Sequence, residues 1–294
     1  MTDKPPPLPN FRSVTPQMSP SSNAPALACD SHLHIYDPHY TQQGAKVECG
    51  DVADYKRIQQ LLGTSRAVVV QPRVYGTDNT VTLAAIQALG EDSTRGIAVV
   101  SADISESLLE QLHEGGIRGI RFSFHTSNGY AGDFDDVLPL ARKIAALGWH
   151  IQVHWTADQM VAHRNILEQS PVPIVFDHLG RMPINEPTHP AHYLVEKMLG
   201  DGRGWMKLSG AYLNTLQGVN GGYDDTDSLA QRWIAAAPER LVWGSDWPHV
   251  TEPAEKPDES ELFDLLTRWC GNMESLRTRI LVDNPAELYQ FSSR

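Results

Sequence analysis

Short runs of apolar and β-branched residues recur along the chain, and each is followed by a stretch with a helical pattern. The runs that predict strands cover residues 27–35, 66–71, 96–101, 116–124, 149–154, 172–178, 205–208 and 240–246. Apolar residues at helical spacing occupy residues 80–89, 105–114, 134–147, 157–169, 193–199 and 228–237. Eight strands that alternate with helices predict parallel βα units closed into a (β/α)8 TIM barrel. A doubly wound open sheet is the alternative topology.

The barrel is expected to form one domain over residues 26–294, a length common for α/β barrels. Residues 1–25 are rich in Pro and Ser and lack the apolar core of a signal peptide. They predict an N-terminal arm that is flexible or wraps along a partner subunit of a homo-oligomer. Residues 128–136 and 215–226 are rich in Gly, Asn and Asp and follow the fourth and seventh predicted strands. They predict long loops on the face where barrel enzymes bind substrates.

The overall charge and the cysteine content narrow the functional class. A formal net charge of −12 argues against nucleic-acid binding, but it allows a locally basic pocket for a small anionic substrate. Because the chain has no apolar run of 18 residues, no membrane span is expected. The cysteines Cys29, Cys49 and Cys270 are far apart and form no CxxC pair, which predicts reduced thiols in a cytoplasmic protein.

The strongest local signal is the sequence Asp-Ser-His-Leu-His-Ile at residues 30–35. Alternation along a strand points His32 and His34 to the same side, which here is the barrel interior. Two imidazoles on one face are suited to metal ligation, to proton relay or to hydrogen bonding with an oxyanion. An isolated pair is equally compatible with two hydrogen-bonded structural histidines.

Other predicted strands end in similar residues. His154 ends the fifth strand, His178 the sixth and Asp246 the eighth. Because the carboxyl ends of barrel strands meet at one mouth, these side chains are expected to converge with the first two histidines. Asp246 is then the candidate general base that accepts a proton from water. The alternative is that this carboxylate caps the following helix, which Pro248 at a first helical position would fit.

Further polar residues follow the same strand ends. A guanidinium in the apolar fourth strand requires a carboxylate partner, which for Arg121 is either a protein side chain or the substrate. Lys207 and Ser209 follow the seventh strand as candidate mouth residues, with a surface loop as the alternative. The candidate substrate-binding residues are Arg73, Tyr75, Arg121, His125, His154 and Tyr212.

Five other histidines are interpreted as surface residues, namely His39, His113, His163, His189 and His192.

Several sequence segments together resemble the amidohydrolase superfamily, in particular the branch that contains 2-pyrone-4,6-dicarboxylate hydrolase and related muconolactone and sugar-acid lactonases. The matching segments begin at residues 30, 68, 116, 148, 172 and 240 and read DSHLHIYDP, VVVQPRVYGTDN, GIRGIRFSF, GWHIQVH, VPIVFDHLGR and RLVWGSDWPH. The resemblance covers approximately residues 28–289. It implies a (β/α)8 barrel, in agreement with the independent strand pattern.

The resemblance also implies site roles. The catalytic residues would be His32, His34, His178 and Asp246, with the carboxylate as base and the histidines orienting water or polarising a lactone carbonyl. No cofactor is favoured, because the pyrone dicarboxylate hydrolase that the chain resembles works without a metal. Phe124 and His125 stand where a metal-bridging Lys or Glu would end the fourth strand, which argues against a binuclear centre. The alternative is one Zn²⁺ or Mn²⁺ ion held by His32, His34, His154 and Asp246.

The expected activity is hydrolysis of a lactone that bears a carboxylate. The loops after the fourth and seventh strands lack the additional arginines that bind carboxylates in pyrone dicarboxylate hydrolase, so another lactone acid is favoured over the pyrone. Arg73 and Arg121 remain available for one carboxylate. The alternatives are a sugar-acid lactone isomerase, a Zn²⁺-dependent decarboxylase and a non-catalytic binding barrel.

Overall fold

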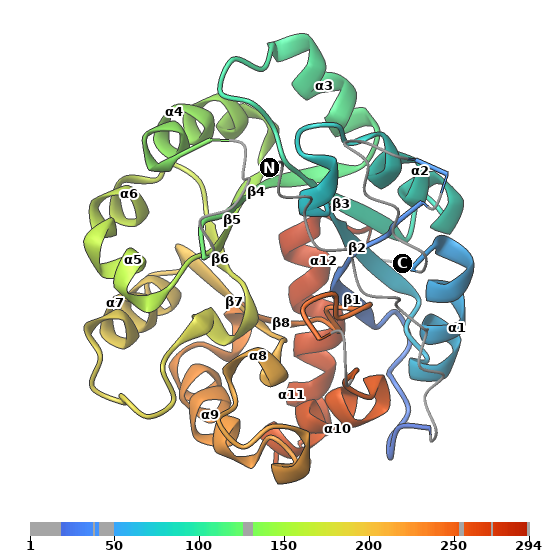
Figure 1. Ribbon diagram of the computed structural model, residues 1–294, viewed down its shortest axis with the longest axis vertical. Helices are drawn as coiled ribbons and strands as arrows, with labels where there is room; N and C mark the ends of the chain where they lie inside the picture. Colours follow the sequence, from blue (N-terminus) through green and yellow to red (C-terminus); the bar gives the residue numbers. More distant parts are fainter. Residues whose placement is uncertain are drawn as a thin grey trace, which may run out of the picture.

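Eight parallel strands lie side by side in chain order and form a nearly closed barrel. The computed structural model describes residues 19–37, 39–40, 50–125, 132–252, 256–271 and 273–292. Residues 1–18 of the predicted arm, residues 128–131 of the first predicted loop, and Cys49 lie outside this part. Figure 1 shows the strands at the centre and the helices around them. The predicted (β/α)8 TIM barrel is therefore confirmed, and the open sheet is excluded.

The strands match the eight predicted runs in order. The sixth and eighth end earlier than predicted, because the chain leaves the extended conformation at His178 and Asp246, which have positive φ angles of 52° and 62°. The bounds are β1 (Cys29–Leu33), β2 (Arg66–Val70), β3 (Thr94–Ala98), β4 (Ile117–Ser123), β5 (His150–His154), β6 (Ile174–Phe176), β7 (Gly204–Leu208) and β8 (Leu241–Trp243).

Helices cover the outside of the barrel. The predicted helix at residues 157–169 is interrupted at His163. The bounds are α1 (Val52–Leu62), α2 (Thr80–Leu89), α3 (Glu106–Glu114), α4 (Phe134–Ile144), α5 (Ala157–Ala162), α6 (Arg164–Gln169), α7 (Pro190–Gly200), α8 (Ala211–Asn214), α9 (Asp227–Ala236), α10 (Glu259–Trp269), α11 (Glu274–Thr278) and α12 (Asn284–Tyr289).

The barrel is closed between its first and last strands by a short set of contacts. Leu33 and Trp247 form a parallel bridge, and the backbone N–H of Asp246 donates to the carbonyl of His32 at 2.8 Å. The buried Asp30 carboxylate accepts bonds from the backbone N–H and the hydroxyl of Ser245, at 2.9 and 2.6 Å. These contacts fix the chain on both sides of the predicted catalytic residues.

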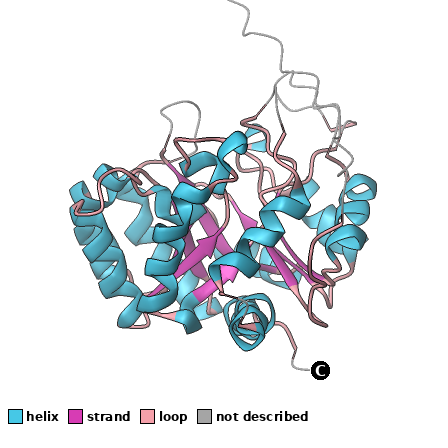
Figure 2. Cartoon of the chain, turned by 90° about the horizontal axis from the view of Figure 1, so that it is seen from below, coloured by secondary structure: helices cyan, strands magenta, loops and turns pink. Residues whose placement is uncertain are grey.

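The C-terminal segment covers the opposite end of the barrel. Tyr289 and Phe291 pack in one buried cluster with strand residues that include Val68 and Val242. Figure 2 shows a helix close to the C-terminus lying below the strands. The carboxyl-terminal mouth of the barrel is therefore the end that remains for a binding site. In the described part of the chain, every helix is too short or too polar to cross a membrane.

Candidate active site

The four predicted catalytic residues lie together at the carboxyl ends of the strands. His32 belongs to β1 and His34 follows it, whereas His178 and Asp246 follow β6 and β8. The Asp246 carboxylate lies 3.4 Å from His32 Nε2, 3.5 Å from His34 Nε2 and 3.8 Å from His178 Nε2. All four residues are buried. The structure thus brings three imidazoles against one carboxylate.

An unusual backbone conformation positions two of these residues. Residues 178–181 all have positive φ angles, between 51° and 74°, so the chain makes a left-handed turn directly after β6. Each non-glycine residue in this conformation costs about 1–2 kcal/mol. The turn directs the side chains of His178 and Arg181 to the mouth, where both contact neighbouring loops. The strain is thus located at the site itself.

Two glycines allow the backbone to approach two of the predicted catalytic imidazoles closely. A Cβ atom at Gly244 would lie 2.6 Å from Cβ of His32. A Cβ atom at Gly210, whose φ angle is +59°, would lie 2.8 Å from Nδ1 of His178. The loops after β7 and β8 therefore pack against the rings at distances that other residues would not permit.

The electrostatic environment keeps Asp246 ionised. Burial by itself would raise the pKa of this carboxyl, but the imidazoles of His178, His34 and His32 hold it well below its ordinary value. The Tyr212 hydroxyl donates to Asp246 Oδ2 at 2.5 Å, which also favours the carboxylate form. Burial lowers the pKa of His178 to about 4, so this ring is neutral near pH 7.

Hydrogen bonding assigns the tautomer of His34. Its Nδ1 lies 2.8 Å from the carbonyl oxygen of Val70, which only accepts hydrogen bonds, so Nδ1 carries the proton. Its Nε2 therefore presents a lone pair to the site centre. This nitrogen lies 3.3 Å from His32 Nε2.

A buried ionic network lies beneath His32. Lys207 is fully buried within β7, so its placement in a mouth loop was wrong. Its ammonium contacts the Ser31 carbonyl, Gln152 Oε1 and His32 Nδ1, at 2.9, 2.7 and 3.2 Å. Burial lowers the pKa of Lys207 to about 8. Sequence reasoning missed this role because a lysine near a strand end resembles an exposed residue.

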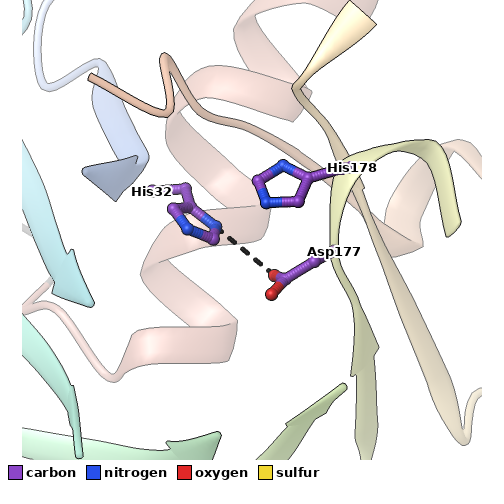
Figure 3. A group of neighbouring side chains, drawn as sticks. All are labelled: His32, Asp177 and His178. Carbon is purple, nitrogen blue, oxygen red and sulfur yellow. Dashed lines mark ion pairs between the residues drawn. The ribbon is translucent and has the colours of Figure 1, made fainter. Parts of the chain in front are cut away.

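Asp177 is the second member of this network and was not among the predicted site residues. Its carboxylate is fully buried and lies 3.3 Å from His32 Nδ1 and 3.6 Å from Lys207 Nζ. Figure 3 shows this carboxylate directed at the His32 ring, with His178 beside it. The sequence signal that could have indicated Asp177 was its position directly before His178. Alternation along the strand, however, gave no reason to expect its side chain in the site.

Asp177 is also the partner of the buried guanidinium on β4. Arg121 Nε donates to Asp177 Oδ2 at 3.0 Å, and Gln152 Nε2 donates to the same oxygen at 3.0 Å. Of the two predicted explanations for Arg121, the protein ion pair is therefore present. A contact with substrate stays a prediction.

His125 and His154 lie next to one another at the mouth. Their rings stack with an interplanar angle of 7° and centroids 4.9 Å apart. Nδ1 of His154 contacts the Ser123 hydroxyl at 3.2 Å, and its Nε2 is buried with no hydrogen-bond partner in the described part of the chain. Burial and the charge of Arg121 hold the pKa of His154 well below its ordinary value, so its ring is neutral.

Arg181 also lies at the mouth. It ends the segment VPIVFDHLGR, but it was not among the predicted site residues. Its Nε and Nη2 lie 3.1 and 3.0 Å from His125 Nε2, and its Nη1 donates to the Leu213 carbonyl at 2.5 Å. Burial, together with the charges of Arg181 and Arg73, lowers the pKa of His125 to about 4. Arg181 therefore contacts a neutral imidazole on which the charge of Arg73 also acts.

Tyr75, a predicted substrate-binding residue after β2, forms a hydrogen bond within the protein. The Tyr75 hydroxyl accepts a hydrogen bond from the backbone N–H of Asp37 at 2.9 Å. Its ring is buried against Tyr36 and Tyr40. Tyr75 thus supports the loop that follows β1, and any contact with substrate stays a prediction.

The histidines interpreted as surface residues differ among themselves. His39 is exposed, as expected. His192 is buried beside Trp233, so its interpretation was wrong. The other three are half-buried, and His113 accepts a hydrogen bond from the Trp149 indole at 2.9 Å. His113 and His192 lie on the outer helices α3 and α7, where an imidazole can pack its apolar ring faces against aromatic neighbours.

Three donor atoms at the site centre fit a tetrahedral metal ion. The sides of the triangle formed by His32 Nε2, His34 Nε2 and Asp246 Oδ1 are 3.3, 3.4 and 3.5 Å. Ligands about 2.1 Å from a tetrahedral Zn²⁺ ion lie about 3.4 Å from one another. His154 is not part of this group, so the predicted ligand set is reduced to three protein residues.

A second group of possible ligands fits a cation poorly. It consists of His32, Asp177 and His178 and is drawn in Figure 3. The Lys207 ammonium lies 3.6 Å from Asp177 Oδ1 and 3.2 Å from His32 Nδ1. Because this positive charge already lies beside the group, a metal ion there would be repelled.

The chain is similar to known proteins over most of its length. A 4-sulfomuconolactone hydrolase from Rhizobium radiobacter is 33% identical over 283 residues, covering 90% of each chain. A 2-pyrone-4,6-dicarboxylate hydrolase from Comamonas testosteroni is 30% identical over 283 residues, covering 92% of each chain. A D-galactarolactone isomerase from Agrobacterium fabrum is 29% identical over 282 residues, covering 93% of this chain and 94% of the relative.

A model of the family described as amidohydrolase matches residues 29–291. The match extends from the first residue of β1 to the segment that follows α12, so it includes all eight strands and every residue of the site centre. The chain therefore belongs to the amidohydrolase family.

Proposed function

We propose that this protein hydrolyses a lactone that bears an anionic substituent, opening the ring with water. The observation that carries the proposal is the convergence of Asp246 with His32, His34 and His178 at the barrel mouth. Two relatives that cover about nine-tenths of the chain are lactone hydrolases, which supports the substrate class.

The proposed reaction begins with proton transfer from water to Asp246. The resulting hydroxide adds to the lactone carbonyl carbon, the ring C–O bond then breaks, and the proton returns from Asp246 to the departing alkoxide. Proton transfer over this short path contributes typically 10²- to 10⁴-fold to such reactions. The product is a hydroxy acid, or its keto form where the ring oxygen was enolic.

His178 is the candidate for polarising the carbonyl. Its Nδ1 lies 3.1 Å from the Ser209 hydroxyl. When that hydroxyl donates to Nδ1, the proton of the neutral ring is on Nε2 and is free to bond the lactone carbonyl oxygen. This bond strengthens as negative charge develops on the oxygen, which stabilises the transition state.

The low pKa of Asp246 makes it a weak base, so the attacking water must itself be acidified. A divalent ion held by His32, His34 and Asp246 would supply this by lowering the pKa of a bound water. The fit of the three donors supports the metal alternative, whereas the metal-free site remains a prediction. In the metal-free form Asp246 Oδ1 accepts the proton of the water, whereas in the metal form His32, His34 and Asp246 would hold the ion.

The anionic substituent is assigned to the cationic side of the mouth. In the described part of the chain, no carboxylate lies within 4.0 Å of the Arg181 guanidinium, although it is partly buried. The charge of Arg73 acts on the same imidazole, His125. A carboxylate or sulfonate placed between the two guanidinium groups would form charge-assisted hydrogen bonds.

The function is tested by adding the protein to a panel of neutral and anionic lactones. A pH indicator monitors the release of acid, with and without a chelator. We expect acid release from anionic lactones, and metal analysis of the purified protein reports the cofactor directly. Failure to open any lactone in the panel, with and without added Zn²⁺ or Mn²⁺, would contradict the proposal.

Replacement of the base tests the mechanism. We expect Asp246→Asn to abolish ring opening, because the amide does not accept the proton from water, while the barrel stays folded. Turnover is measured by product formation, and folding by circular dichroism. Near-normal turnover in this variant would show that another group is the base.

A lactone isomerase is the second candidate, favoured by the similarity to the galactarolactone isomerase. In that reaction a substrate hydroxyl replaces water as the nucleophile, and the same site would serve. NMR of the product separates the two, since an isomerase returns another lactone and a hydrolase returns a free acid. A decarboxylase would instead release CO₂.

A further inference from the structure

His32 Nδ1 faces two partners of opposite hydrogen-bonding character. The Lys207 ammonium lies 3.2 Å away, and Asp177 Oδ1 lies 3.3 Å away. All three residues are buried within the barrel. The ring nitrogen either accepts a hydrogen bond from the ammonium or donates one to the carboxylate, but it does not do both. The partner that forms the hydrogen bond with Nδ1 determines which nitrogen of His32 carries the proton.

The hydrogen-bond geometry favours Lys207 over Asp177 as the partner of His32 Nδ1. An ammonium has three donor protons, and Lys207 has three acceptors, namely the Ser31 carbonyl, Gln152 Oε1 and His32 Nδ1. In the described part of the chain, Asp177 Oδ1 lacks a hydrogen-bond partner of acceptable geometry. His32 Nδ1 is therefore an acceptor, and its proton is on Nε2.

This tautomer affects the metal-binding triangle. Nε2 of His32 faces His34 Nε2 and Asp246 Oδ1, two acceptors at 3.3 and 3.4 Å, and its proton bonds them. A nitrogen that carries a proton has no lone pair for a cation. Metal binding by His32 therefore requires the other tautomer, in which Nδ1–H donates to Asp177 Oδ1 and Nε2 is bare.

We propose that Lys207 and Asp177 act as positioning residues that select the tautomer of His32 and thereby set how tightly the site holds a divalent cation. The inference rests on the metal-binding form of the proposed site, but it does not depend on which lactone is the substrate. Lys207 opposes the metal-binding tautomer and Asp177 favours it.

The exchange requires no net gain or loss of protons. One proton leaves Nε2 of His32 and one is added to Nδ1, so the ring stays neutral. Lys207 keeps its three protons. The N–H group that had donated to His32 Nδ1 turns towards Asp177 Oδ1, which lies 3.6 Å from Lys207 Nζ. Arg121 and Gln152 continue to bond the other oxygen of this carboxylate.

The proposal is tested by measuring Zn²⁺ affinity in competition with a chromogenic chelator. Because Lys207→Met removes the donor that opposes the metal-binding tautomer, we expect it to bind Zn²⁺ about tenfold or more tightly than the unchanged protein. Asp177→Asn weakens the acceptor for Nδ1–H and should bind Zn²⁺ about 10- to 100-fold more weakly. Lys197→Met, at an exposed lysine on α7, is the matched control and should leave the affinity unchanged.

Opposite effects of the two substitutions are required, since a purely structural role would weaken metal binding in both. An equal or lower affinity in Lys207→Met, as judged on protein whose thermal melting shows that it is folded, would overturn the proposal. The absence of Zn²⁺ binding in both the unchanged protein and Lys207→Met would also overturn it. The affinity is read without substrate, so failure of the lactone assay does not affect the result.

A second measurement needs no variant of the network. Nitrogen-15 NMR of histidine-labelled protein distinguishes a bare ring nitrogen from a protonated one, and the His32 signals are assigned by their loss in His32→Gln. We expect bare Nδ1 in metal-free protein and protonated Nδ1 after Zn²⁺ is added. Protonated Nδ1 in the metal-free protein would contradict the assigned tautomer.

Discussion

Individual residues at the mouth have different roles according to the atoms that face them. In the proposed reaction, Asp246 and the three imidazoles around it act on the water and the carbonyl, whereas Arg181 and His125 lie to one side and bind the anionic substituent. This division separates the chemical step from recognition of the substrate's charge. The two functions should therefore respond to different substitutions.

Arg181→Gln tests the recognition side. Losing a charge-assisted hydrogen bond of about 1.5–3 kcal/mol should raise KM for an anionic lactone by about 10- to 100-fold, with a smaller effect on kcat. The KM of a neutral lactone should change little. Steady-state kinetics on a matched pair of lactones measures this, with Arg164→Gln on α6 as the control. An equal rise in KM for the anionic and the neutral lactone would show that Arg181 does not recognise the negative charge of the substrate.

At this scale the sequence predicted side chains near the carboxyl ends of strands, but it did not predict how buried charged side chains pair beneath them. His32, His178 and Asp246 were found because barrel strands bring their carboxyl ends together. Lys207 and Asp177 were missed, because a hydrophobic pattern does not show that a buried cation and a buried anion from different strands neutralise one another. Only the barrel geometry brings them within reach.

Among the elements, strands were predicted more accurately than the segments that follow them. Strands of a parallel barrel are buried on both faces, so they appear as continuous apolar runs of a recognisable length. The left-handed turn at residues 178–181 has no comparable signature, because only one of its four residues is glycine. Helices α1 and α10 were not predicted either, although each begins at a capping aspartate, Asp51 and Asp258.

The loop after β7 offers a test at this scale through Gly210. In Gly210→Ala the added methyl would lie 2.8 Å from the His178 ring at a φ angle of +59°, so ring and loop must separate. We expect kcat to fall by about tenfold or more with the barrel intact, since small displacements of catalytic groups are costly. Gly200→Ala has open space around its Cβ and is the control. Unchanged kcat in Gly210→Ala would show that the close approach is not needed.

For the whole molecule, the buried neutral histidines predict how stability depends on pH. Burial lowers the pKa values of His178 and His125 to about 4 and that of His150 to about 3, whereas an unfolded histidine titrates near 6.5. The unfolded chain therefore binds more protons between these values, and stability is lost as the pH falls from about 6.5 towards 4. The shift of His178 alone corresponds to about 3 kcal/mol.

Denaturant unfolding of the metal-free protein at a series of pH values checks this expectation. The free energy of unfolding should be nearly constant above pH 7 and should decrease steadily below about 6.5. Below about pH 4 the loss should continue, because Asp246 and Asp177 take up protons in the unfolded chain while their depressed pKa values keep them ionised in the folded protein. A stability that is independent of pH between 7 and 4 would contradict the neutral state assigned to these rings.

The contacts that close the barrel between Leu33 and Trp247 have a consequence for the kinetics of folding. They join residues that are more than two hundred positions apart in the chain, and they fix both His32 and Asp246. Contacts of such long sequence separation form late, because much chain entropy must be lost before they are gained. A partly folded intermediate with most of its βα units in place would thus be inactive. The return of catalysis after dilution from denaturant would time the closing of the barrel, separately from the recovery of its helices.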